Sequence, residues 1–396
     1  MPATLLSGRF FMKILFVSLG CDKNLADTEM MLGMLRDRGY SFTDDEAEAE
    51  AVIVNTCCFI GDAKEESIQA LLDMAELKDS SQLRALVAAG CLAQRYREEI
   101  QREIPQVDAI VGTMAIEEIA DALDGILEGR PGNHYRELDS APPVYRNRML
   151  TTGGHYAYLK IAEGCNKRCT YCIIPKVRGG YRSIPMEELE AQARVLADQG
   201  VKELILVAQE TTLYGTDLYG RKCLPELLRR LARVSGLYWI RLLYCYPEEI
   251  TEELAETIAA EPKICHYLDI PIQHASDGVL KRMGRRTTEE ELREQIGRLR
   301  ERIPDICLRT TLISGFPGET QEDFEELYRF VNEMEFDRLG VFPYSQEEDT
   351  GAADMPGQIE ESVKEFRRDE LMELQQAIAF EKAESLVGRR LTVMVE

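Results

Sequence analysis

Short apolar runs alternate with helical patterns along almost the whole chain, and this alternation limits the available folds more than any other feature. In the N-terminal region, four apolar runs are each followed by an amphipathic segment. The expected strands cover residues 14–19, 51–55, 85–89 and 107–111, and the expected helices cover residues 25–38, 62–77, 94–104 and 115–127. Strands that alternate with helices form a parallel sheet with helices on both faces. The sequence therefore predicts an α/β protein whose N-terminal domain, residues 12–128, is a doubly wound parallel sheet.

The alternation resumes after residues 129–154, a stretch rich in proline and glycine that is typical of a linker. Six further apolar runs are each followed by a helical pattern. They cover residues 157–162, 203–207, 238–243, 267–270, 306–313 and 339–342. Six βα units favour a partial (β/α)6 barrel over residues 155–387, with its active site at the carboxyl ends of the strands. The last residues, 388–396, are similar to the start of a truncated small β-barrel of the TRAM type.

Composition and charge restrict the compartment and the partners. No apolar run approaches the roughly 18–20 residues of a membrane helix, and the first eleven residues lack the features of a signal peptide. We therefore expect a cytoplasmic protein without a membrane partner. The formal net charge of -23 counts against nucleic acid as the main partner and suits a basic protein substrate. Eleven cysteines in a reducing compartment favour metal or redox chemistry over disulfides.

Cys165, Cys169 and Cys172 form a C-x3-C-x2-C triplet directly after the first expected barrel strand. Three thiolates can hold three irons of a four-iron cluster and leave the fourth iron open for a small molecule. A zinc site usually needs a fourth cysteine or histidine at close spacing, and the next cysteine is Cys223. The triplet therefore predicts an iron–sulfur cluster with an open iron.

Cys21, Cys57 and Cys91 each follow an expected parallel strand of the N-terminal domain. The carboxyl ends of parallel strands meet at one edge of the sheet, which is the usual ligand site. Three distant cysteines can therefore meet in space and bind a second cluster, again with one open iron. The alternative is that all three are buried core thiols.

The triplet after the first strand of a partial barrel resembles the radical S-adenosylmethionine (SAM) superfamily. This resemblance implies that the open iron binds SAM, which is cleaved reductively to a 5′-deoxyadenosyl radical. Tyr171, before the third cysteine, matches the aromatic residue that lies near the adenine. Gln209 and Glu210 end the second barrel strand, and Ile313 and Gly315 end the fifth, where family members contact SAM; ordinary packing or turn roles remain the alternative.

The whole set of cysteine motifs is similar to the methylthiotransferase family, and the resemblance covers nearly the whole chain. It implies two 4Fe-4S clusters, with Cys21, Cys57 and Cys91 as ligands of the auxiliary one. The adjacent Cys58 leaves the choice between Cys57 and Cys58 open. The implied partners include a reducing electron donor protein.

Two motifs resemble the RimO-type branch of that family, which modifies an aspartate of ribosomal protein S12. They are SLGCDKNLAD at 18–27 and CIIPKVRG at 172–179. The resemblance implies insertion of a methylthio group at the aspartate β-carbon, with ribosomal protein S12 or the small ribosomal subunit as partner. Two alternatives are a tRNA adenosine methylthiotransferase and a non-enzymatic iron–sulfur electron carrier.

Basic residues surround the barrel triplet and are candidates to hold a substrate or SAM carboxylate. They are Lys167, Arg168, Lys176, Arg178 and Arg182. Ordinary solvated charges are the alternative for most of them. His274 is the one histidine with a plausible place in the active site, against the alternative of a structural histidine.

Overall fold

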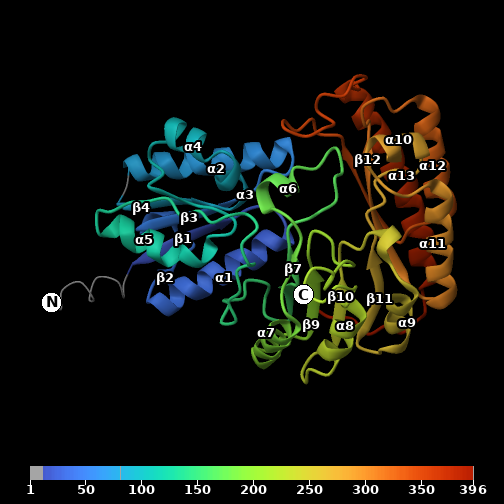
Figure 1. Ribbon diagram of the computed structural model, residues 1–396, viewed down its shortest axis with the longest axis horizontal. Coiled ribbons are helices and arrows are strands. Elements are labelled where there is room, and N and C mark those ends of the chain that lie inside the picture. The colour runs from blue at the N-terminus through green and yellow to red at the C-terminus, as the bar shows by residue number, and fades with distance from the viewer. Residues whose placement is uncertain (1–11, 81, 396) are drawn as a thin grey trace. The chain divides into compact units, whose positions relative to one another are not determined.

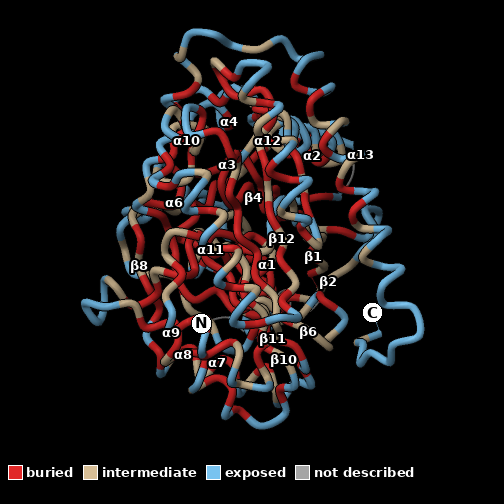
Figure 2. Tube along the Cα trace, turned by 90° about the vertical axis from the view of Figure 1, so that its right-hand side faces the viewer, coloured by how far each residue is buried: buried red, intermediate tan, exposed pale blue. Residues whose placement is uncertain are grey.

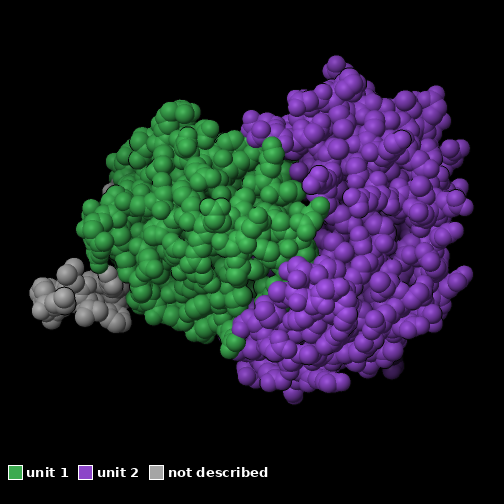
Figure 3. All heavy atoms as spheres, in the orientation of Figure 1, with its two compact units in different colours: residues 1–152, 163–166, 173–184 green, residues 153–162, 167–172, 185–396 purple. Residues whose placement is uncertain are grey.

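The structure is a computed structural model that describes residues 12–80 and 82–395. The described residues divide into two compact units (Figure 3). Unit 1 contains the described chain up to Thr152 together with residues 163–166 and 173–184. Unit 2 contains residues 153–162 and 167–172 and the described chain from Pro185 onward. The segments on either side of the barrel cysteines therefore belong to unit 1, while the domain boundaries expected at 128 and 154 stay predictions.

Unit 1 is built on a sheet of five parallel strands, one more than the sequence predicts. The strands are β1 (Lys13–Ser18), β2 (Ser41–Phe42), β3 (Ala51–Thr56), β4 (Ala85–Ala89) and β5 (Ala109–Val111), in the spatial order β2-β1-β3-β4-β5 (Figure 1). The additional strand, β2, has two residues and pairs with Lys13 and Ile14. This is the flavodoxin-like order, in which ligands bind where the strand order reverses, between β1 and β3.

Helices cover both faces of this sheet, which confirms the predicted doubly wound α/β domain. The helices are α1 (Asp22–Arg38), α2 (Gly61–Ser80), α3 (Gly90–Arg95), α4 (Arg97–Glu103) and α5 (Ile119–Leu127). Side chains of α1 and α5 form one hydrophobic core with the sheet, and side chains of α2, α3 and α4 form the other. β3 and β4 lie between these layers and are buried along their whole length (Figure 2). A strand covered on both faces reads as a continuous apolar run, which is why the sequence identifies it.

Unit 2 contains the six parallel strands that the sequence predicts. They are β6 (Tyr156–Lys160), β9 (Glu203–Val207), β10 (Trp239–Leu242), β11 (Ile264–Asp269), β12 (Cys307–Ser314) and β13 (Arg338–Pro343), in the order β13-β12-β11-β10-β9-β6 (Figure 1). The strands follow one another in this sheet in the order in which they occur in the sequence, because β7 and β8 pair separately. The predicted partial (β/α)6 barrel is thus present as a sheet of six parallel strands.

The helices of unit 2 connect these strands. They are α7 (Met186–Asp198), α8 (Leu224–Ala232), α9 (Glu252–Ala260), α10 (Asp277–Arg282), α11 (Glu289–Arg302), α12 (Gln321–Met334) and α13 (Glu361–Ser385). Thr288 and Thr320 begin α11 and α12 with capping boxes, in which Glu291 and Asp323 reach back to the cap. These caps fix where each loop after a strand ends. The candidate site residues of unit 2 lie on those loops and strand ends.

Three short elements, β7 (Ala162–Glu163), α6 (Ile174–Arg178) and β8 (Arg182–Ser183), flank the barrel cysteines in sequence. The described residues after α13, up to Val395, form no strand, so the expected start of a TRAM-like domain finds no support here. Across residues 12–80 and 82–395, no helix has the length and apolar content needed to cross a membrane.

Candidate cofactor sites

Three cysteines of unit 1 follow neighbouring strands at the carboxyl edge of the sheet. Cys21 follows β1 and forms the N-cap of α1, Cys57 follows β3, and Cys91 lies in the first turn of α3 after β4. The strand order reverses between β1 and β3, so this edge is where a sheet of this order binds its ligand. The structure therefore brings the three thiols to one edge of one sheet.

The close approach at Gly20 shows that two of these thiols are neighbours. A Cβ atom on Gly20 would lie 2.8 Å from Cβ and 2.9 Å from Sγ of Cys57, and φ at Gly20 is +92°. Both facts require glycine before Cys21. Burial raises the pKa of the Cys57 thiol, and the nearby Cys21 thiol raises it further. Burial also raises the pKa of Cys91, and the Cys57 and Cys21 thiols add to that effect. The three thiols thus lie within electrostatic range of one another.

Cys58 has a different environment from Cys57. Its side chain is fully buried in the hydrophobic core that α2 forms with the sheet, together with Val52 and Leu71. Burial raises the pKa of the Cys58 thiol to about 11, although Arg95 opposes this effect. Cys57 instead faces the turn at Gly20. This geometry favours Cys57 over Cys58 as the thiol available to a ligand at the sheet edge.

Cysteine thiols of a protein can bind either a single metal ion or an iron–sulfur cluster. Among the residues that the structure describes, no three cysteine, histidine, aspartate or glutamate side chains could hold a single metal ion. All eleven cysteines are free thiols. An iron–sulfur cluster binds each thiolate at a different iron, so its ligands need not converge on one point. Three thiols at the ends of separate strands are a donor set of the kind that an iron–sulfur cluster uses.

Arg178, on α6, is the residue of this site whose place the sequence did not reveal. It is 2% exposed, and its Nε donates a hydrogen bond to Sγ of Cys91 at 3.3 Å. Its Nη1 donates to Asp27 at 2.7 Å and to Glu163 at 3.2 Å, and its Nη2 donates to Asn24 at 2.5 Å. Burial opposes the charge of Arg178, but Cys91, Glu163 and Asp27 outweigh it and raise its pKa. Arg178 is therefore a buried cation bound to a candidate cluster ligand.

A signal for this contact is present in the sequence. Asn24 and Asp27 belong to the segment SLGCDKNLAD, and Arg178 belongs to the segment CIIPKVRG. These segments are separated by more than a hundred residues, yet their polar side chains bond to one another in unit 1. Arg178 thus pairs with protein carboxylates and a thiol, which does not fit its expected role of holding a substrate carboxylate.

The barrel cysteines follow β7. Cys165 groups with unit 1, where its N–H donates to the carbonyl of Gly179 at 3.1 Å. Gly164 before it has φ +76°, and a Cβ there would collide with the Gly180 carbonyl, so the turn requires glycine. Cys169 and Cys172 group with unit 2, where the Cys172 N–H donates to the Cys169 carbonyl at 3.1 Å in a tight turn.

Charged and aromatic side chains of unit 2 surround Cys169. Its Sγ lies 4.0 Å from the Tyr246 hydroxyl. The guanidinium of Arg285 lies 4.2 Å from the centre of the Tyr246 ring, and the Lys167 ammonium lies 4.9 Å from it. Lys167 also contacts Glu249 at 2.6 Å and Glu248 at 3.4 Å. The cations near this thiol are therefore paired with acidic residues or stacked on an aromatic ring.

Three of the expected SAM contacts lie at one hydrophobic cluster of unit 2. Tyr171 and Ile313 pack against Phe316, whose ring meets that of Tyr171 edge-on at 6.5 Å. Gly315 has φ +70°, and a Cβ there would collide with the side chain of Lys364 from α13. The turn after β12 therefore accepts only glycine, and its buried backbone packs against Lys364 of α13.

Gln209 and Glu210, the other expected SAM contacts, lie in the loop after β9. Glu210 is fully buried, and its carboxylate accepts hydrogen bonds from the backbone N–H and the hydroxyl of Thr212. The Lys167 ammonium lies 4.0 Å from the Glu210 carboxylate. Burial raises the pKa of Glu210 to about 7, although Thr212 and Lys167 act in the opposite direction. Glu210 is therefore a buried carboxyl group on the triplet side of the barrel.

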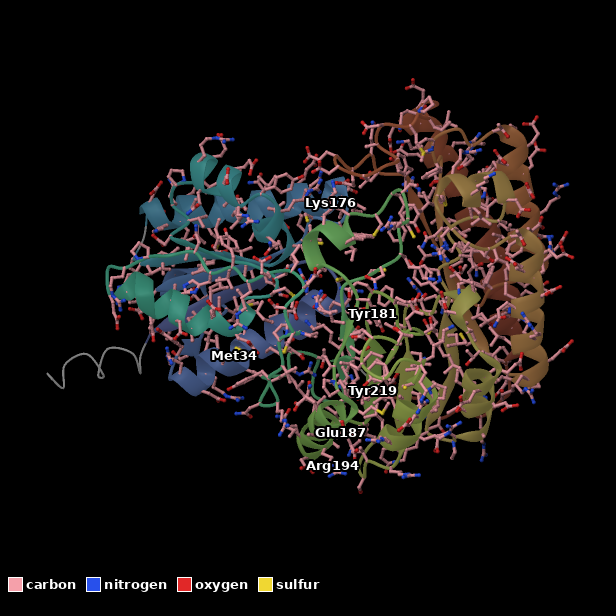
Figure 4. All side chains as sticks on the ribbon, in the orientation of Figure 1. Met34, Lys176, Tyr181, Glu187, Arg194 and Tyr219 are labelled. Atoms are coloured by element: carbon pink, nitrogen blue, oxygen red, sulfur yellow. The ribbon has the colours of Figure 1, made fainter. Side chains whose placement is uncertain are left out.

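The remaining candidates have structural or exposed positions. His274 is fully buried, and its Nδ1 accepts a hydrogen bond from the Ser276 N–H at 3.0 Å. Burial lowers the pKa of His274 to about 3, so it is neutral at physiological pH. Arg182 donates to two backbone carbonyls of the α6 turn. Lys176 is exposed on α6 (Figure 4), and Arg168 is also exposed.

Two family models match the chain, one in each unit's main segment. The Radical SAM superfamily matches residues 159–331, and the Uncharacterized protein family UPF0004 matches residues 13–112. Among solved structures, the radical S-adenosylmethionine methyltransferase TsrM from Kitasatospora setae matches with a TM-score of 0.62 and 18% identity, over 83% of this chain and 72% of that one. The cobalamin-dependent S-adenosylmethionine radical enzyme OxsB matches with a TM-score of 0.57 and 14% identity, over 96% and 57%. These two likenesses show the fold alone. The Radical SAM model that matches residues 159–331 indicates the class, a radical SAM enzyme.

Sequence relatives define the family within that class. The ribosomal protein uS12 methylthiotransferase RimO of Lachnoclostridium phytofermentans is 61% identical over 97% of this chain and 88% of its own length. Relatives of the same name from Acetivibrio thermocellus and Clostridioides difficile are 52% and 49% identical, each over 97% of this chain and over 86% and 87% of their own lengths. The chain belongs to the RimO family and is a radical SAM methylthiotransferase. The radical SAM family implies SAM and a 4Fe-4S cluster as cofactors.

Proposed function

We propose that this methylthiotransferase inserts a methylthio group at the β-carbon of an aspartate in ribosomal protein uS12. The observation that carries the proposal is the meeting of Cys21, Cys57 and Cys91 at the strand-order reversal of unit 1, in a chain that also has the barrel triplet. The names of the relatives in the RimO family support the substrate.

The chemistry explains why two sets of thiols are needed. The β-carbon of an aspartate carries hydrogens that no protein base removes readily at neutral pH, so the C–H bond must be broken by hydrogen-atom abstraction. When bound, a cluster at the triplet supplies the electron that cleaves SAM for this purpose, and a second cluster at the unit 1 thiols holds the sulfur. In this proposal Cys165, Cys169 and Cys172 hold the first cluster, and Cys21, Cys57 and Cys91 hold the second.

Other side chains of unit 2 would orient SAM. The partly exposed ring of Tyr171 offers an apolar surface suited to an adenine, and the buried ring of Phe316 and the turn at Gly315 support it from behind. The buried carboxyl group of Glu210 is suited to a positively charged amino group, because a neighbouring cation favours its ionised form. Ile313 and Gln209 lie beside these groups in the chain and complete the proposed SAM contacts.

Charge supports a basic protein as substrate. The chain carries a formal net charge of -23, and ribosomal proteins are basic because they bind RNA. Opposite net charges accelerate encounter and disfavour a polyanion such as tRNA. Free thiols and a ribosomal substrate both suit the cytoplasm. A reducing protein must supply electrons to the site.

The test is a reaction of the anaerobically reconstituted chain with SAM, dithionite and either recombinant uS12 or bulk tRNA. Mass spectrometry should find one added methylthio group on a uS12 aspartate and none on tRNA. Modification of tRNA alone would replace this proposal with an adenosine methylthiotransferase. Release of no 5′-deoxyadenosine would favour the electron-carrier alternative.

A further inference from the structure

The contacts of Arg178 form one connected polar network inside unit 1. Arg178 binds two carboxylates that are themselves buried, Asp27 at 2% exposure and Glu163 at 0%. A single guanidinium therefore faces two acidic groups, so its own charge is more than balanced by oxygen partners before the thiol of Cys91 is considered. Arg178 therefore does not need the Cys91 thiolate to balance its charge. The hydrogen bond from its Nε to Sγ of Cys91 is an additional contact.

The geometry of the guanidinium is fixed from several directions. Asp27 and Glu163 both accept from Nη1, and Asn24 accepts from Nη2. Asn24 is itself held, because its Nδ2 donates to the carbonyls of Leu19 and Thr56 at 2.9 Å each. The planar fork has no freedom to rotate once these atoms are placed. Its Nε is consequently directed at Sγ of Cys91, 3.3 Å away.

The same network includes both flanks of the barrel triplet. Glu163 stands two positions before Cys165, and Arg178 stands six positions after Cys172. Both residues belong to unit 1 together with α1 and Cys91. The segment that carries the triplet is therefore fastened, at both of its ends, to the residues that surround the unit 1 thiols.

We propose that Arg178 is a positioning residue for the auxiliary cluster, which holds Cys91 by an N–H···S hydrogen bond and thereby raises the reduction potential of that cluster. This inference rests on the proposed binding of a cluster by Cys21, Cys57 and Cys91. Hydrogen bonds to ligand sulfurs stabilise the more negative, reduced cluster and are known determinants of cluster potential. Loss of the hydrogen bond should therefore make reduction harder.

The experiment uses the full chain with Cys165, Cys169 and Cys172 replaced by alanine, so that only the auxiliary cluster can form. In this background Arg178→Lys keeps the charge but removes the fork, and Asp27→Asn keeps Arg178 but loosens one of its supports. Arg148→Lys is the matched control, because Arg148 is another buried arginine of unit 1 and faces Glu29 on α1. Iron content and the midpoint potential, followed by electron paramagnetic resonance, are measured for all four proteins.

The parent is expected to bind about four irons per chain. Arg178→Lys should lower the midpoint potential by about 59 mV, which corresponds to a tenfold change in the ratio of oxidised to reduced cluster for a one-electron couple. Asp27→Asn removes a buried negative charge and keeps the Arg178 side chain, so it should not lower the potential, and Arg148→Lys should leave it in place. If Arg178→Lys binds less iron while Arg148→Lys loads fully, the positioning role is also supported.

Two results would overturn parts of the argument separately. An unchanged potential in Arg178→Lys, or an equal change in Arg148→Lys, would show that Arg178 is an ordinary buried ion pair. A parent that binds no iron although it is folded would instead remove the proposed auxiliary cluster itself.

Discussion

The chain assembles its two sets of cysteines in opposite ways. Cys165, Cys169 and Cys172 are close because eight consecutive residues contain them, so the local turn suffices. Cys21, Cys57 and Cys91 are separated by more than thirty residues each, and only the parallel sheet brings them to one edge. The first set can be recognised from spacing alone, whereas the second depends on the fold. The prediction of a dispersed site is therefore only as reliable as the prediction of the strand order that brings its residues together.

One buried charged group from each region shows a further contrast. In unit 1 the guanidinium of Arg178 is enclosed by two carboxylates and a thiol. In unit 2, among several buried charged groups, the carboxyl group of Glu210 has Lys167 as a neighbouring cation, and Lys167 is shared with Glu248 and Glu249. The arginine keeps its charge in that setting, while the carboxyl group is pushed toward its neutral form. If unit 1 serves sulfur insertion and unit 2 serves radical formation, substitutions in the two regions should have different effects.

The strongest test separates radical formation from sulfur insertion. Cys91→Ala should abolish the methylthio product on uS12, because the auxiliary cluster loses a ligand, while SAM and dithionite still yield 5′-deoxyadenosine. Cys169→Ala should abolish both. Chromatography of the nucleoside and mass spectrometry of uS12 measure the two outcomes in one reaction. Methylthio product from Cys91→Ala would contradict the assignment of separate roles.

Cys57 and Cys58 offer a sharper test within the dispersed set. Cys57→Ser should reduce the iron content of the reconstituted chain from about eight to about four per chain, since one four-iron centre is lost. Cys58→Ser should retain about eight irons and lose less than the about 1–3 kcal/mol that an unpaired buried hydroxyl costs, because Arg95, which bonds to the Cys58 thiol, can bond to the serine hydroxyl. Iron analysis and chemical denaturation distinguish the two, and the reverse pattern would assign the ligand to Cys58.

Substitution of one glycine in each region also separates the two sites, with smaller expected effects on iron content and SAM binding. Gly20→Ala and Gly315→Ala each place a side chain on a backbone with positive φ, which costs about 1–2 kcal/mol. Gly20→Ala should also displace Cys57 and lower auxiliary iron, whereas SAM affinity stays near that of the parent. Gly315→Ala should weaken SAM binding, measured by calorimetry, and leave the iron content unchanged. Equal losses of iron in both variants would show a general loss of folding instead.

The sequence predicts most of this architecture because its strands are buried on both faces. Continuous apolar runs such as β3 and β4 are visible without any tertiary information. β2 was missed because two residues, Ser41 and Phe42, leave no pattern, and yet β2 sets the strand-order reversal beside Cys21. The six-stranded sheet of unit 2 was predicted in full, whereas the short α10 was not.

The candidate site was less accessible to sequence reasoning. Spacing identifies thiols, but it cannot say that Arg178 bonds to Asp27, Asn24 and Cys91. That outcome depends on contacts between segments more than a hundred residues apart. Burial decides it, since an arginine at 2% exposure must find acceptors within the protein. A charged residue inside a motif is therefore an ambiguous signal until its exposure is known.

The buried carboxyl group of Glu210 should make the stability of the chain depend on pH. Its pKa is raised from an ordinary value of 4.5 to about 7 by burial. Between these values the unfolded chain has lost the proton that the folded chain retains, so the free energy of unfolding falls as pH rises, and the contribution is fully present only below pH 4.5. Denaturation of the cluster-free chain at pH 5 and pH 8 should show this loss, on the order of 2–3 kcal/mol, in the parent. Glu210→Gln should remove most of it, and Glu294→Gln, an exposed residue of α11, should not. Equal pH dependence in all three chains would mean that Glu210 remains ionised, and that both regions then hold their buried charges by pairing.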